Sequence, residues 1–291
     1  MKPHSCTISA LVSAAFLLAG LNASAHNVEG TLDKIAESGE FVIGYRADSS
    51  PLAYENSSGQ PSGYAVDICR RVAASVNAHF PDKNIETKFV KISADERISA
   101  VVEGDVDIEC GSTTITLSRK EKVDFSLPTF VTGGSVLTLA ATGVQGMADL
   151  AGKKIGVAKG TTTVEQLRAH LAENLIDAEV VIVANRNEGM RQLNHGEIHA
   201  LASDQIVLIG QIIEAIDPKR YSLSDEVFSY EPYGLVLRRD DAEFRLVVNR
   251  SLAQLYRSGA HVDIYYKWIG RIGIGVPPIL AAMYQLNAVP E

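Results

Sequence analysis

A weak internal repeat constrains the fold of this chain more than any other feature of its sequence. Residues 98–108 (ISAVVEGDVDI) and 191–200 (RQLNHGEIHA) share one plan: an amphipathic helix, a glycine that ends it, and a short buried strand. Glycine suits the position after a helix because it adopts the left-handed backbone conformation without a Cβ penalty. Two copies of this unit, far apart in the chain, predict two lobes built on the same plan.

The segments around the repeat predict parallel βαβ units. Apolar strand-like runs at 41–45 and 154–158 are followed by helical patterns at 63–77 and 162–175. Strands that alternate with helices are typical of α/β folds with a largely parallel sheet. We therefore expect an α/β protein with one such sheet in each lobe.

Two short segments mark where the chain crosses between the lobes. These hinge segments lie near residues 131–136 and 229–234. Two crossings make one lobe continuous, over 132–233. The other lobe is discontinuous and uses 26–131 together with 234–291.

The last part of the chain is expected to return to the discontinuous lobe. Helical patterns cover 242–257 and the aromatic-rich segment 260–269. The tail from Gly270 onward contains Pro277 and Pro278, which favour an extended segment, with or without a last helical turn, that is either packed or frayed.

The repeat also predicts where a ligand would lie. Counting eight residues onward from Gly104 and Gly196 reaches Ser112 and Asp204, each near the carboxyl end of a predicted strand. Ligands of open α/β sheets bind outside those strand ends. Two lobes that face each other would direct both side chains into a shared cleft.

The first 25 residues have the pattern of a cleavable secretory signal. Lys2 supplies a positive start, residues 8–21 are apolar, and Ala23-Ser24-Ala25 is a small-x-small cleavage site. The alternative is a membrane anchor, but the apolar stretch is shorter than the roughly 20 residues that span a bilayer. Cys6 precedes the apolar stretch, which disfavours a lipoprotein. We expect an exported, periplasmic protein that begins at His26.

Charge and cysteine content exclude several classes of protein. Residues 1–25 hold one lysine and no acid, so the mature chain keeps 26 basic and 35 acidic residues. A nucleic-acid partner is not expected, because phosphate backbones are bound by clustered Lys and Arg. Cys69 and Cys110 either pair in an oxidising compartment or remain as two small buried hydrophobes.

Several short motifs, in this order and spacing, resemble the type II periplasmic solute-binding proteins of amino-acid ABC importers. The resemblance covers essentially the whole mature chain. The motifs that carry it are VIGYR at 42–46, GYAVD at 63–67, GDVDIECGSTT at 104–114, Arg119 with VDFS at 123–126, GTT at 160–162, and Asp204. Residues 109–114, together with Arg46 and Arg97, resemble the glutamate/aspartate-binding branch.

This resemblance implies two α/β lobes joined by a two-strand hinge, with the ligand cleft between them. It further implies a monomer that binds a small amino acid and delivers it to an ABC permease in the inner membrane. No cofactor or metal is expected. The sequence contains no phosphate loop, and its one His-x-x-x-His spacing, His195 and His199, falls in a predicted turn and strand, which favours a structural role for both.

The resemblance also assigns roles to residues at the two charged ends of an amino acid. Arg119 would clamp the α-carboxylate, as guanidinium geometry favours, and Asp204 would accept hydrogen bonds from the α-ammonium. Ser112 and Thr114 would add hydroxyl and backbone contacts. Structural alternatives exist for all four: a surface arginine at a helix start, a helix cap, and loop-capping hydroxyls.

A helix N-terminus offers a further place for a carboxylate. Thr161 and Thr162 follow Gly160 at the start of the predicted helix, where free N–H groups carry partial positive charge. A plain N-cap is the structural alternative, and it is compatible with that role.

Three arginines bear on the ligand's side chain. In the glutamate/aspartate branch, residues matching Arg46 and Arg97 recognise a second carboxylate; the alternative is two solvated surface arginines. Arg186 lies where that branch commonly has His, and Ala94 replaces a Ser that it often has. An additional arginine would make the cleft more positive, which suits glutamate, aspartate or a related dicarboxylate.

Other functions remain open at this stage. The same fold occurs in periplasmic cyclohexadienyl dehydratases, for which Glu109 or Glu188 could be the catalytic acid. No nucleophile–base pair is recognisable, so an enzyme is not expected. A binding protein for another polar amino acid, or one that also serves a separate sensor kinase, fits the same motifs.

Overall fold

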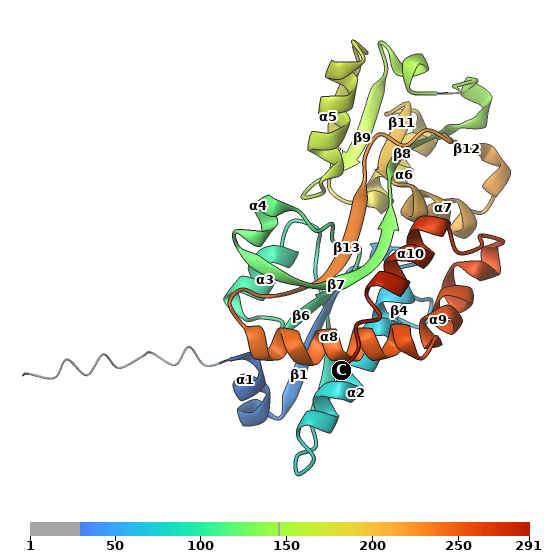
Figure 1. Ribbon diagram of the computed structural model, residues 1–291. Coiled ribbons are helices and arrows are strands. Elements are labelled where there is room, and N and C mark those ends of the chain that lie inside the picture. The colour runs from blue at the N-terminus through green and yellow to red at the C-terminus, as the bar shows by residue number, and fades with distance from the viewer. Residues whose placement is uncertain (1–29, 145) are drawn as a thin grey trace, which may run out of the picture.

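Two five-stranded sheets form the centres of two α/β lobes, and two strands run from one lobe toward the other (Figure 1). The structure is a computed structural model that describes residues 30–144 and 146–291. The predicted signal sequence, residues 1–25, lies outside the described residues.

The sheet of the first lobe combines strands from both ends of the chain. Its order is β5-β1-β6-β13-β7. Strands β5 and β6 run parallel to β1, whereas β13 is antiparallel to both β6 and β7. The bounds are β1 Glu40–Tyr45, β5 Glu86–Lys91, β6 Ile108–Cys110, β7 Val123–Thr132 and β13 Glu231–Arg238.

The second sheet repeats this plan. Its order is β10-β9-β11-β8-β12, with β10 and β11 parallel to β9 and with β8 antiparallel to β11 and β12. Gly104 and Gly196 both end a helix in the left-handed conformation, at φ 79° and 72°. The predicted internal repeat is therefore confirmed. The bounds are β8 Gly134–Leu139, β9 Lys154–Ala158, β10 Glu179–Val183, β11 Ala200–Asp204 and β12 Tyr221–Leu223.

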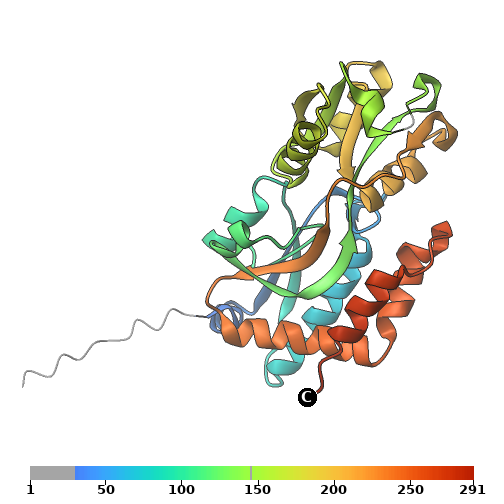
Figure 2. The ribbon, with the colours of Figure 1, turned by 45° about the horizontal axis from the view of Figure 1, so that its top comes forward.

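Helices connect the parallel strands and cover the sheets (Figures 1 and 2). Side-chain caps begin several of them, such as Asn185 before α6 and Asp241 before α8. The helices are α1 Thr31–Ser38, α2 Tyr64–His79, α3 Arg97–Glu103, α4 Leu117–Lys120, α5 Thr163–Glu173, α6 Arg186–His195, α7 Gln205–Glu214, α8 Ala242–Arg257, α9 Ala260–Trp268 and α10 Pro278–Leu286. Short 3₁₀ turns occupy Ala140–Thr142, Met147–Leu150, Pro218–Arg220 and Gly270–Ile272.

The C-terminal tail differs from its prediction. Residues 278–286 form helix α10, which is longer than a single turn. Pro278 occupies its first position, where the missing N–H costs no hydrogen bond. Leu280, Met283 and Tyr284 are buried against the first lobe, so the segment is part of the core.

A small antiparallel sheet follows β1 and was not predicted. It comprises β2 Asp48–Ser49, β3 Ala53–Glu55 and β4 Pro61–Ser62. This sheet places Asp48 and Ser49 directly beside Arg46, at the edge of the first lobe that faces the second.

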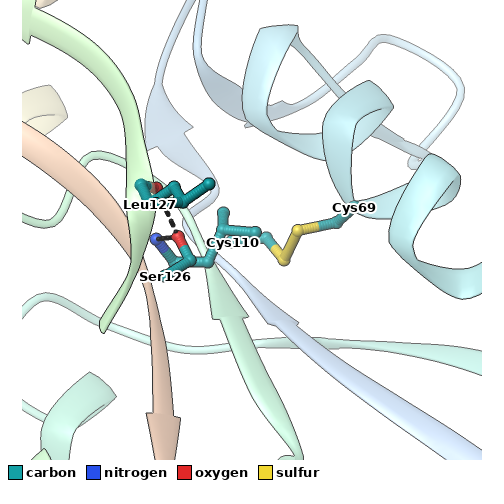
Figure 3. The surroundings of a disulfide bond; sticks show 5 residues. Cys69, Cys110, Ser126 and Leu127 are labelled. Atoms are coloured by element: carbon teal, nitrogen blue, oxygen red, sulfur yellow. Dashed lines mark hydrogen bonds between the residues drawn. A yellow bond between two sulfur atoms is a disulfide. The ribbon is translucent and has the colours of Figure 1, made fainter. Parts of the chain in front are cut away.

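A disulfide joins Cys69 of α2 to Cys110, the last residue of β6 (Figure 3). Of the two interpretations of this cysteine pair, the structure supports the bonded one. Both residues are fully buried in the core of the first lobe. The bond fixes the end of β6, from which the chain continues directly into the segment 111–114.

The two segments that connect the lobes lie next to each other. Strand β7 ends at Thr132 and β8 begins at Gly134, while the return segment reaches β13 at Glu231. The Gly134 N–H donates to Ser229 Oγ over 3.0 Å, and the Phe228 N–H donates to the Gly134 carbonyl over 2.8 Å. The two predicted hinge segments therefore lie side by side.

No helix in the described ranges is both long enough and apolar enough to cross a membrane.

Candidate functional site

The predicted site residues gather where the two lobes face each other, at the carboxyl ends of the central strands. This is the position that open α/β sheets use for ligands. Arg46 follows β1, Ser112 and Thr114 follow β6, Thr161 and Thr162 follow β9, Asp204 ends β11, Arg97 and Arg186 open α3 and α6, and Arg119 lies in α4.

Arg46 and Arg97 are fully buried cations with unused hydrogen-bond donors. Arg46 Nη2 donates to Asp48 Oδ1 over 2.6 Å, and Arg97 Nη2 donates to the Gly160 carbonyl over 3.1 Å. The Nε and Nη1 atoms of both arginines are buried and have no partner among the described residues. Burial, reinforced by neighbouring arginines, lowers the pKa of each to about 10, so both remain charged at neutral pH. A buried cation of this kind is stabilised by an anion.

Arg119 is partly buried rather than a solvated surface residue. Its Nη1 donates to the Thr114 carbonyl over 2.8 Å, which holds the side chain against the segment after β6. Thr116 caps the short helix α4 by accepting the Arg119 N–H. Burial lowers the pKa of Arg119, and the nearby carboxylates oppose this shift.

Arg186 connects the two lobes. Its Nε donates to Ser203 Oγ over 2.7 Å, its Nη1 to Ser49 Oγ over 2.9 Å, and its Nη2 to Asp204 Oδ2 over 3.3 Å. Ser49 belongs to the first lobe, whereas Ser203 and Asp204 belong to the second. The predicted additional cation is thus present at the cleft, but each of its nitrogens already contacts the protein.

Asp204 keeps one carboxylate oxygen unused. Although it directly precedes α7, its side chain makes no capping hydrogen bond. Its Oδ2 accepts from Arg186, while Oδ1 is buried without a partner in the part of the chain that the structure describes. Asp204 therefore offers a buried acceptor at the cleft.

The hydroxyls of Thr114 and Thr162 converge on one acid that the sequence prediction missed. Thr114 Oγ1 donates to Glu231 Oε2 over 2.6 Å, and Thr162 Oγ1 donates to the same oxygen over 3.0 Å. Thr162 precedes α5 but does not cap it with its side chain. Glu231 is the first residue of β13, so one buried carboxylate joins groups from the two lobes at the hinge.

Ser112 and Thr161 make weaker or more local contacts. Ser112 Oγ lies 3.4 Å from Ser49 Oγ, and Thr161 Oγ1 donates to the Ala158 carbonyl over 2.8 Å. Thr161 thus stabilises the turn that leads into α5.

Acidic side chains counterbalance the arginines. Four acids are buried or largely buried among them: Asp48, Glu109, Asp204 and Glu231. Of these, only Asp204 was assigned to ligand binding from the sequence. Asp48 lies only two positions after Arg46, and this proximity was the one available sequence signal. Burial raises the pKa of Glu231, and the charge of Asp204 raises it further.

The two glutamates considered as catalytic acids occupy different environments. Glu109 is fully buried, and burial raises its pKa although Arg97, Arg46 and Arg119 oppose the shift. Glu188 forms an ion pair with Arg191 over 2.7 Å on the surface of α6. Hydrogen bonds from Arg191 and Gln192 lower its pKa to about 2, so it is ionised at neutral pH and unsuited to donate a proton.

A cavity of about 310 Å³ opens beside Arg46. It is lined by both lobes: Arg46, Asp48 and Lys91 come from the first lobe, and Ala184 and Asn185 from the second. Nearby, Lys159 Nζ and Asp95 Oδ2 form an ion pair across the lobes at 2.6 Å. The lobes therefore contact each other around the site.

Within residues 30–144 and 146–291, no group of three or more His, Cys, Asp or Glu side chains is placed to hold a metal ion.

Comparisons with known proteins identify the family and the fold. A family model of bacterial extracellular solute-binding proteins, family 3, matches residues 41–271. The L-glutamate/L-aspartate-binding protein of Pseudomonas aeruginosa is 32% identical over 261 residues, which are 89% of this chain and 86% of that protein. The glutamate/aspartate import solute-binding protein of Salmonella typhimurium is 30% identical, covering 88% and 87% of the two chains.

A solved structure matches the fold. The ancestral amino-acid-binding protein described as a precursor of cyclohexadienyl dehydratase superposes with a TM-score of 0.69 and 28% identity, over 82% of this chain and 99% of that one.

Proposed function

Because the chain belongs to the bacterial extracellular solute-binding proteins of family 3, we propose that it captures an acidic amino acid, L-glutamate or L-aspartate, in the periplasm. The bound amino acid would then be delivered to the permease of an ABC importer in the inner membrane. Two relatives with 32% and 30% identity are glutamate/aspartate-binding proteins, which supports this ligand class.

The pair Arg46 and Arg97 carries the proposal. Both guanidinium groups are buried, and each leaves Nε and Nη1 without a partner in the described chain. Unsatisfied buried donors cost free energy, and a ligand carboxylate would satisfy them through charge-assisted hydrogen bonds. A second carboxylate on the ligand is the group that these two arginines would recognise.

Other residues are candidates to bind the α-carboxylate and the α-ammonium, the two groups that all amino acids share. Arg119 would bind the α-carboxylate, assisted by Ser112 and the N-terminus of α5 near Thr161 and Thr162. Asp204 would accept hydrogen bonds from the α-ammonium through Oδ1. Arg186 would act by holding Asp204 in place, because it already donates to that carboxylate over 3.3 Å.

Ligand capture would proceed by closure of the two lobes. We assign residues 26–131 and 234–291 to the first lobe and 132–233 to the second, with hinges near 131–136 and 229–234. Removal of residues 1–25 would release the mature chain, and the mature protein would act as a monomer.

One observation favours a second candidate, a dehydratase for cyclohexadienyl acids. Glu109 is buried, both of its oxygens lack a hydrogen-bond partner within the described residues, and burial raises its pKa. A carboxyl group whose pKa is raised by burial takes up a proton more readily, and in that form it could donate one. Turnover of prephenate or arogenate by the purified protein would support this activity over pure binding.

Calorimetry with Glu, Asp, Gln, Asn, Arg and cystine tests the leading proposal. We expect binding of glutamate or aspartate and much weaker binding of the uncharged and basic ligands. An absence of heat with both acidic amino acids, combined with binding of another ligand, would reassign the specificity.

A further inference from the structure

Glu231 receives hydrogen bonds from three hydroxyl groups. Thr114 Oγ1 and Thr162 Oγ1 donate to Oε2 over 2.6 and 3.0 Å, and Ser229 Oγ donates to Oε1 over 2.8 Å. Ser229 itself accepts the Gly134 N–H over 3.0 Å, so its proton is directed to Glu231. The carboxylate is 1% exposed and lies at the start of β13.

This arrangement fixes the hydrogen-bonding direction of the two threonines. A hydroxyl group has one proton to donate, whereas an ionised carboxylate can only accept. With both protons committed to Glu231, Thr114 Oγ1 and Thr162 Oγ1 have only lone pairs left for any other partner. The two oxygens lie 3.3 Å apart, so they form a paired acceptor between the lobes.

Asp204 adds a third acceptor. Its Oδ1 is buried without a partner in the described part of the chain, and its charge acts on both Glu231 and the neighbouring Tyr233. An ammonium group has three N–H donors, which matches three acceptors from three elements.

We propose that Glu231 sets the polarity of the ligand site, by turning Thr114 and Thr162 into acceptors that select an ammonium group at this position. The inference rests on the proposed function, because it assumes an amino-acid ligand. Glu231 is a positioning residue here: it acts through the threonines. The α-carboxylate would meet the backbone N–H groups at the start of α5, and the ammonium would meet the hydroxyl oxygens. A carboxylate placed against those oxygens would be repelled, and an apolar carbon would leave them unpaired, so dicarboxylates without an amino group should bind poorly.

The test compares L-glutamate with glutarate, which keeps both carboxylates but lacks the amino group. Both threonines donate to the same oxygen, Oε2, so an amide could still accept from both, and the variant must remove the acceptor altogether. In Glu231→Leu, no oxygen remains to accept the two protons, so both threonines are free to turn them toward the ligand. We expect calorimetry to show about tenfold weaker glutamate binding with less than about threefold change for glutarate, which lowers the preference for glutamate. Asp225→Asn, which removes an exposed acid near the same hinge, is the matched control and should keep the wild-type preference.

A second variant covers the case in which Glu231→Leu does not fold. Thr162→Val keeps the shape of the side chain and removes one acceptor, and it should lower the preference for glutamate in the same direction. Wild-type glutamate-to-glutarate ratios in the folded variants would overturn the role of Glu231 while leaving glutamate capture intact. Wild-type protein that binds no acidic amino acid would instead refute the proposed function, and this inference with it.

Discussion

Reduction of the disulfide between Cys69 and Cys110 should remove a large part of the stability of the first lobe. The bond closes a loop with a sequence separation of 41 residues. In the chain-entropy treatment, a loop of that length restricts the denatured state by about 13 cal/mol/K, or about 4 kcal/mol at 25 °C. Because the stability of a domain is commonly about 5–15 kcal/mol, we expect a reduced protein that still folds but unfolds at clearly lower denaturant concentration.

Urea unfolding followed by circular dichroism measures this difference. Both sulfur atoms are buried, so the protein should be reduced in denaturant and refolded in the presence of dithiothreitol. The double variant Cys69→Ala/Cys110→Ala is the control, and dithiothreitol should not change its transition. A shift equivalent to less than about 1 kcal/mol between oxidised and reduced wild type would refute the loop-entropy reasoning.

Three further predictions follow from individual contacts. In Gly210→Ala, the new Cβ would lie 2.5 Å from the carbonyl carbon of Ser50 in the opposite lobe, so calorimetry should show at least about tenfold weaker ligand binding while each lobe keeps its thermal stability. The pKa of Asp67 is lowered below its ordinary value of 3.8. Burial alone would raise this pKa, but hydrogen bonds from Lys267, Trp268 and Arg70 outweigh it. The stability that this carboxylate contributes is thus present above pH 3.8 and is lost as the pH falls through the lowered pKa. Asp67→Asn should remove about 1–3 kcal/mol at neutral pH and flatten the acid dependence, which the single tryptophan reports by fluorescence. Arg119→Ala should abolish binding of every amino acid in the calorimetric panel, and retained binding would contradict its role at the α-carboxylate.

The repeated architecture could be predicted because it depends on local signals. Strand β9 and helix α8 have the bounds that their apolar patterns indicated, and the glycines after α3 and α6 end those helices as expected. The small sheet β2–β4 could not be predicted, because strands of two or three residues carry no periodicity. The length of helix α10 was not predicted, because the pair Pro277 and Pro278 favoured an extended segment, although a proline at the first helical position is compatible with a helix.

The candidate site was only partly predictable. Strand ends and the family motifs located the arginines, Asp204 and the hydroxyl residues at the cleft. They could not show that Asp48 pairs with Arg46, or that Glu231 accepts hydrogen bonds from both lobes. The contacts of Glu231 join elements far apart in the sequence, and Asp48 meets Arg46 only because the small sheet β2–β4 turns the chain back beside it. Side-chain hydrogen bonds of both kinds leave no periodic pattern. Arg186 illustrates the same limit, since its partners on two lobes define its role.

The measurement that tests the central claim most directly is calorimetry of wild type and Arg46→Ala with L-glutamate and L-glutamine. Loss of one buried charge-assisted contact should cost about 3 kcal/mol, or about a hundredfold in the affinity for glutamate. Affinity for glutamine, which lacks the second carboxylate, should change far less. Recognition of an acidic side chain by Arg46 predicts this selective loss. Equal losses for the two ligands, or wild-type protein that prefers glutamine, would contradict it.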